Sequence, residues 1–128
     1  MPHYVSWAIM LLTITILLAF QPAHVVFALF TLFFTALPEE WFFRAYFMVR
    51  QGEGFRANAI TSALFSLMHG LTRDWTTALL VLAPSLFYGW LYQRTRDLPL
   101  LVLVHTLSNL IFAIFLAESL VSWMSYLQ

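Results

Sequence analysis

Long apolar runs, separated by short polar stretches, extend along the whole chain. An α-helix needs about 20 mainly apolar residues to cross the hydrocarbon core of a bilayer. The pattern therefore predicts an all-α fold, a polytopic transmembrane bundle of about five to six helices. The expected spans are residues 5–20, 23–49, 57–71, 75–92 and 98–117.

Proline residues set the helix count. Pro22 ends the first run, because proline cannot continue a helix and restricts the residue before it. Pro38 interrupts the second run, which is interpreted either as one long helix kinked at this proline or as two helices joined there. No repeat or low-complexity linker divides the chain, so we expect a single transmembrane domain over residues 1–128 with a motif-bearing core over 38–109.

The composition also points to a membrane. Hydrophobic residues make up 62% of the chain and charged residues 9%, whereas a soluble domain is about half apolar and about a quarter charged. The formal net charge is zero, so no basic surface for nucleic acid is expected. The chain has no cysteine, which excludes disulfides, thiolate catalysis and cysteine-ligated zinc.

The loop charges predict an orientation. With five spans, Arg50, Arg56, Arg94 and Arg96 fall on one side of the membrane, and Arg73 falls on the other. The positive-inside rule then places the amino terminus in the cytoplasm. The start of the chain lacks the basic segment of a cleavable signal peptide, so the first run is expected to remain as a span. A compact chain without targeting signals favours a prokaryotic inner (plasma) membrane.

Ionisable side chains inside the apolar runs are the main indication of function. A charge at the centre of a bilayer costs about 2.5–3.5 kcal/mol on insertion scales, so such groups are usually functional. They are Glu39, Glu40, Arg44, His69 and His105.

The paired acids follow Pro38. Glu40 and Arg44 are four residues apart in the order that favours a helical ion pair. Glu39 points about 100° away from Glu40 and can take another role. The helix dipole near a proline start favours carboxylate, while burial in lipid opposes it, so a carboxylate here suits a general base. The alternative is a structural ion pair with an additional acid.

Two further pairs lie four residues apart. Phe65 and His69 share one helix face, and His69 could accept or relay a proton. His105 and Asn109 share another, and two donors aimed at one point could hold a developing oxyanion. Each pair alone could instead make interhelical hydrogen bonds.

The depths of these groups agree. A rise of about 1.5 Å per residue places Glu39 and Asn109 roughly 16 Å from the cytoplasmic ends of their helices. His69 lies roughly 18 Å and His105 roughly 10 Å from the same side. Three helices therefore bring polar groups to a similar level.

A metal site is the main chemical alternative to metal-free hydrolysis. Two histidines and two glutamates could bind zinc or iron. However, no His-Glu-x-x-His or Glu-x-x-His spacing occurs. A serine hydrolase is disfavoured because Ser66 and Ser108 lack a surrounding elbow of glycines. We expect no metal and no cofactor.

The ordered set of motifs resembles the CPBP family of intramembrane glutamic endopeptidases, which includes the type II CAAX prenyl endopeptidases and bacteriocin-processing or immunity proteins. The motifs are Glu39-Glu40-x-x-x-Arg44, Phe65-x-x-x-His69 and His105-x-x-x-Asn109. Many relatives carry extra helices, so the chain resembles a minimal core of the family, which leaves room for a homo-oligomer.

The resemblance implies residue roles. Glu39 would activate water with the assistance of His69, and His105 and Asn109 would hold the oxyanion. The supporting residues would be Glu40, Arg44 and Phe65. The implied activity is metal-independent hydrolysis of a peptide bond in a peptide or protein presented at the bilayer.

Two other functions stay open at the level of sequence. Intramembrane acids and histidines also mark proton or ion paths, so the chain could be a small transporter or proton relay. It could also be a catalytically inactive peptide-binding or immunity protein that keeps the fold.

Overall fold

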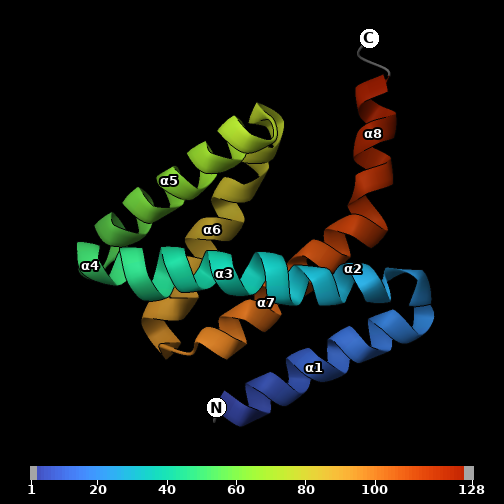
Figure 1. Ribbon diagram of the computed structural model, residues 1–128, viewed down its shortest axis with the longest axis horizontal. Coiled ribbons are helices and arrows are strands. Elements are labelled where there is room, and N and C mark those ends of the chain that lie inside the picture. The colour runs from blue at the N-terminus through green and yellow to red at the C-terminus, as the bar shows by residue number, and fades with distance from the viewer. Residues whose placement is uncertain (1–2, 126–128) are drawn as a thin grey trace. The chain divides into compact units, whose positions relative to one another are not determined.

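The computed structural model describes residues 3–125, and these residues are helical except at short connections (Figure 1). No strand is found among them, which confirms the all-α prediction. The helices fall into five continuous segments, as the apolar pattern predicts. They are α1 (His3–Phe20), a long helix (Pro22–Gln51), α5 (Phe55–Thr72), α6 (Trp75–Thr95), and α7 (Leu98–Ile111) with its continuation through η4 (Phe112–Leu116) and α8 (Ala117–Ser125).

The Pro22–Gln51 helix is continuous through Pro38, which decides between the two interpretations of the second run. Its subsegments are η1 (Pro22–His24), α2 (Val25–Phe30), η2 (Thr31–Ala36), α3 (Leu37–Glu40), η3 (Trp41–Met48) and α4 (Val49–Gln51). Both η2 and η3 are π-helical, so wider turns flank the short α3 segment that holds Pro38. Proline lacks the backbone N–H of a regular turn, and π turns often occur at functional sites.

Three of the helices formed by the described residues are long and apolar enough to cross a membrane. They are His3–Phe20, Pro22–Gln51 and Leu98–Ser119. The predicted spans at 57–71 and 75–92 form helices as expected, but their composition is more polar. On α5 the buried polar residues form a stripe that consists of Asn58, Thr61, Ser62 and His69.

The chain divides into two compact units, each described by itself. The central unit is Pro38–Leu101, and the terminal unit takes in the described residues up to Leu37 and from Val102 onward. In the terminal unit, a small apolar core joins α1, α2 and α7 through Ile14, Ala28 and Leu110. The single domain predicted over residues 1–128 remains a prediction.

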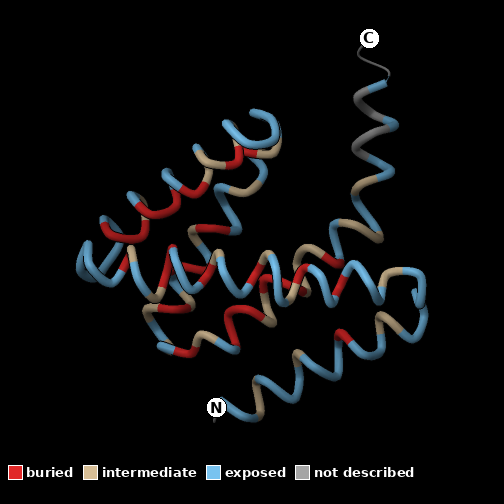
Figure 2. The backbone as a smooth tube through the Cα atoms, viewed as in Figure 1, coloured by how far each residue is buried: buried red, intermediate tan, exposed pale blue. Residues whose placement is uncertain are grey.

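In the central unit, α5 and α6 form an antiparallel hairpin and pack along their length, and η3 packs against both. Buried residues recur along one side of α5 (Figure 2). Asp74 begins α6 as its N-cap, because the backbone N–H of Thr77 donates to Asp74 Oδ1 at 2.7 Å. This bond, followed by one from the Thr77 hydroxyl, lowers the pKa of Asp74.

Four arginines of the central unit lie at or next to helix ends. Arg50 lies in α4 just before its last residue, Arg56 is the second residue of α5, Arg94 lies in the last turn of α6, and Arg96 follows that helix as its C-cap. Contacts between these ends confirm their proximity, because Gln93 donates to the Gly54 carbonyl at 3.1 Å and Arg96 pairs with Glu53. The turn between α4 and α5 uses positive φ angles, 102° at Gly52 and 85° at Gly54, which glycine adopts readily.

Candidate active site

The predicted pair of Glu40 and Arg44 forms in the central unit. Both side chains are fully buried, and Arg44 Nε lies 3.3 Å from Glu40 Oε2. The two residues sit at the junction of α3 and the wider η3 turn. Breaking such a pair by removing one partner costs about 3–5 kcal/mol, because the other charge stays buried.

Arg44 reaches from η3 to α6. Its Nη2 atom donates to the Ser85 carbonyl oxygen at 2.8 Å and to the Ser85 hydroxyl at 2.6 Å. Hydrogen bonds from a charged donor are shorter and about twice as strong as neutral ones. Ser85 therefore fixes one edge of the guanidinium.

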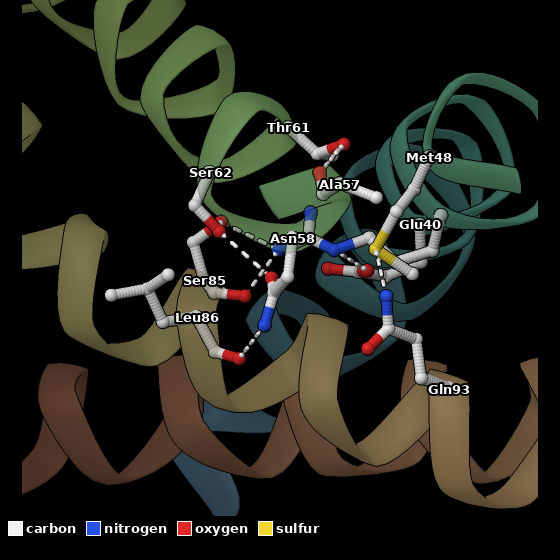
Figure 3. A network of polar contacts seen from close by, with 10 residues as sticks. Glu40, Met48, Ala57, Asn58, Thr61, Ser62, Ser85, Leu86 and Gln93 are labelled. Atoms are coloured by element: carbon white, nitrogen blue, oxygen red, sulfur yellow. Dashed lines mark hydrogen bonds and ion pairs between the residues drawn. The ribbon is translucent and has the colours of Figure 1, made fainter. Parts of the chain in front are cut away.

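The hydroxyl of Ser85 continues the network into α5 (Figure 3). It donates to Ser62 Oγ at 3.1 Å, and Ser62 donates to Asn58 Oδ1 at 3.2 Å. The amide nitrogen of Asn58 donates back to the Leu86 carbonyl on α6 at 2.7 Å. Four polar side chains thus connect η3, α5 and α6 in the interior of the central unit.

Aromatic rings contact the guanidinium. The Cζ atom of Arg44 lies 4.9 Å from the ring centroid of Phe65 and 5.8 Å from that of Tyr88. Phe43 packs edge-on against Phe65 with ring centroids 5.1 Å apart. Cation–π contacts are strongest where water is excluded, so these rings help to hold the buried charge.

His69 completes this group on α5. Its ring centroid lies 4.4 Å from that of Phe65, and its Nδ1 atom lies 2.9 Å from the Phe65 carbonyl oxygen. A carbonyl oxygen only accepts, so Nδ1 carries the hydrogen in this bond. In the neutral ring, Nε2 then holds the lone pair that a base requires.

Glu39 lies next to this network on α3. Its side chain is half-buried, and its Oε2 atom is shielded from solvent. Glu39 and Glu40 both lie close enough to Arg44 to interact with it electrostatically. The buried cation thus offsets negative charge on two neighbouring carboxylates.

His105 and Asn109 belong to the terminal unit, on the part of α7 that follows Val102. The α-helical geometry of Leu98–Ile111 puts them on one face, as their spacing predicts. His105 is buried and Asn109 is half-buried.

The structure thus brings Glu40, Arg44, Phe65 and His69 together in one unit with Glu39 beside them. Sequence interpretation missed Ser85, Ser62, Asn58 and Tyr88. A signal for two of them was present, because Asn58 and Ser62 lie four residues apart in an apolar helix and in register with Phe65 and His69. No group of three or more His, Asp or Glu side chains that could hold a metal ion occurs within residues 3–125.

Comparison with known proteins identifies a family. The family model for type II CAAX prenyl endopeptidase Rce1-like proteins matches residues 4–111, which includes every motif described above. No curated protein and no solved structure matches the chain.

Proposed function

Since this chain belongs to the type II CAAX prenyl endopeptidase Rce1-like family, and is therefore an integral membrane peptidase of the CAAX type, we propose that it cuts its substrate with a water molecule activated by Glu39 and His69. This family match carries the general activity. The buried assembly around Arg44 supports the particular residues.

Glu39 is the general base of this mechanism. Its carboxylate lies on the same short α3 segment as Glu40 and within the electrostatic reach of Arg44. Glu40 and Arg44 pair as opposite charges, and half-buried Glu39 lies beside this pair. A base held in this way can take a proton from water as the water attacks the scissile carbonyl.

His69 assists in the proton transfer. The bond from Nδ1 to the Phe65 carbonyl orients the imidazole, so that Nε2 is the atom that handles the proton. Glu39 first takes the proton from water, and His69 Nε2 can then receive it from Glu39 and pass it to the departing amine, which needs a proton to leave.

His105 and Asn109 form the oxyanion site in this proposal. The family resemblance assigns them this role, and their shared face on α7 supports it. Two side-chain donors that face the developing negative oxygen stabilise the tetrahedral intermediate more than the ground-state carbonyl.

The substrate is a peptide or protein presented at or in the bilayer. The arginines gathered at one end of the central unit support a cytoplasmic position for that end, and hence a cytoplasmic amino terminus. We place the protein in a prokaryotic inner membrane, with the cleavage site reached from the cytoplasmic side.

Mass spectrometry of candidate peptides incubated with the purified protein in bilayers tests this function. Wild-type protein should produce cleaved products, and a chelator should not abolish them. Loss of cleavage with a chelator and its return with zinc would replace the glutamate mechanism with a metal mechanism. Binding without cleavage by wild-type protein would favour an inactive peptide-binding protein.

A further inference from the structure

The hydrogen bonds around Arg44 run in one direction. A guanidinium only donates, so the Ser85 hydroxyl must accept from it and turn its own hydrogen toward Ser62. Ser62 accepts this hydrogen and donates to Asn58 Oδ1. Each side-chain oxygen thus accepts from the preceding residue in the network, starting from Arg44, and aligned bonds of this kind strengthen one another.

A backbone carbonyl fixes Asn58, the residue of this hydrogen-bond network that is farthest from Arg44 along the series of bonds. The amide nitrogen of Asn58 donates to the Leu86 carbonyl, which leaves Oδ1 facing Ser62. Gly89 makes room for this amide, because a Cβ atom at this position would overlap Asn58 Oδ1. The series of hydrogen bonds therefore begins at Ser85 on α6, passes through Ser62 and Asn58 on α5, and returns to α6 at Leu86.

Arg44 is held to Ser85 by hydrogen bonds and to Glu40 by an ion pair. The two bonds from Nη2 to Ser85 are 2.8 and 2.6 Å long. The contact with Glu40 is an ion pair at 3.3 Å, and Arg44 Nε makes no hydrogen bond within the described part of the chain. Hydrogen bonds depend steeply on angle, whereas an ion pair depends mainly on distance.

We propose that Ser85 is a positioning residue for hydrolysis, whose hydroxyl, supported by Ser62 and Asn58, holds the Arg44 cation against the Glu39–Glu40 pair. This role rests on the proposed function of Glu39 as the general base. Ser85 does not contact substrate in this account. Its loss should therefore lower kcat and leave KM unchanged.

The test compares Ser85→Thr with Ser85→Val in bilayer-embedded protein. Threonine and valine have nearly the same shape. Relative to serine, each adds a methyl group at Cβ, but threonine keeps the hydroxyl whereas valine has a second methyl group in its place. We expect kcat of Ser85→Val to be about tenfold below that of Ser85→Thr, the scale of one charged hydrogen bond. KM should agree within about twofold, because binding does not use this group. Equal kcat values would overturn the positioning role.

A matched control separates this role from helix packing. Ser66 on α5 also donates to a carbonyl on α6, that of Ala78 at 2.6 Å, and is not part of the Arg44 network. Ser66→Ala should leave kcat near the wild-type value. If the added methyl unfolds both Ser85 variants, Ser62→Ala takes their place, because it removes the acceptor of the Ser85 hydrogen. Its kcat should fall several-fold below that of Ser66→Ala, and equality would contradict the proposal.

Glu39→Gln is assayed in the same series so that the two proposals can fail separately. If Glu39→Gln is inactive while Ser85→Val matches Ser85→Thr, only the positioning role is overturned. If Glu39→Gln keeps full activity, the proposed mechanism fails, and the positioning role fails with it.

Discussion

His69 Nδ1 lies 2.9 Å from the carbonyl oxygen of Phe65, one helical turn earlier on α5. This bond fixes which ring nitrogen carries hydrogen in the neutral imidazole. The opposite nitrogen, Nε2, is the one assigned to proton transfer.

His69→Asn separates these two functions of the ring. The asparagine amide can still donate to the Phe65 carbonyl, but it has no atom at the position of Nε2. We expect the thermal unfolding temperature to stay near that of the wild type and kcat to fall by about 10²–10⁴-fold. Circular dichroism melts and peptide cleavage on the same preparation measure both. Retained cleavage in a folded variant would exclude His69 from the proton transfer.

Asn109→Ala removes one of the two proposed oxyanion donors. We expect kcat to fall by about 10²-fold with little change in KM, because the donor acts on charge that develops only in the transition state. Ser108→Ala is the neighbouring control, since its hydroxyl is satisfied within the helix by the Val104 carbonyl. Similar rates for the two variants would argue against an oxyanion role for Asn109.

Gly89→Ala tests the close packing of α5 against α6. The added methyl group would occupy the place of the Asn58 amide, and overpacking of this kind typically costs about 1–3 kcal/mol. We therefore expect a lower unfolding temperature and lower kcat.

Gly70→Ala is the control for this substitution. Its added methyl would meet the ring of Trp75, which is 61% exposed and can move aside. An unfolding temperature equal to that of Gly89→Ala would show that the Asn58 contact has no special importance.

Asp74 should make stability depend on pH in the acidic range. Hydrogen bonds from Thr77 lower its pKa in the folded protein. A carboxyl whose folded pKa is lowered contributes its full stabilisation above the unfolded pKa of about 4 and loses it as pH falls through the folded pKa. Asp74→Asn keeps an oxygen for the cap but does not titrate. Its unfolding temperature should therefore change less between neutral pH and pH ~3 than that of the wild type. Parallel pH dependence in the two proteins would contradict this role.

Local features of the fold and the site were predictable from sequence, and long-range ones were not. The predicted helix over 57–71 is observed as Phe55–Thr72, and the Glu40–Arg44 spacing predicted an ion pair that forms. Both depend on neighbours within one or two turns. The Arg44–Ser85 contact joins residues 41 positions apart, so no periodic pattern could indicate it.

Proline and polar residues marked the other differences. Pro38 left open one kinked helix or two joined helices, and the structure has one continuous helix with π turns on both sides of the proline. The short polar residues of α5 could be counted in the sequence. Only the structure shows that Asn58 and Ser62 are linked by hydrogen bonds to Ser85, which contacts Arg44.

Single-turnover cleavage of a membrane-presented peptide by Glu39→Gln is the most direct test of the central claim that Glu39 activates the attacking water. The substitution keeps the size of the side chain and removes its basicity. Glu118→Gln serves as the control, because it makes the same change at an exposed glutamate of α8. We predict no detectable cleavage by folded Glu39→Gln and wild-type rates for Glu118→Gln. Cleavage by Glu39→Gln at the wild-type rate would contradict the account.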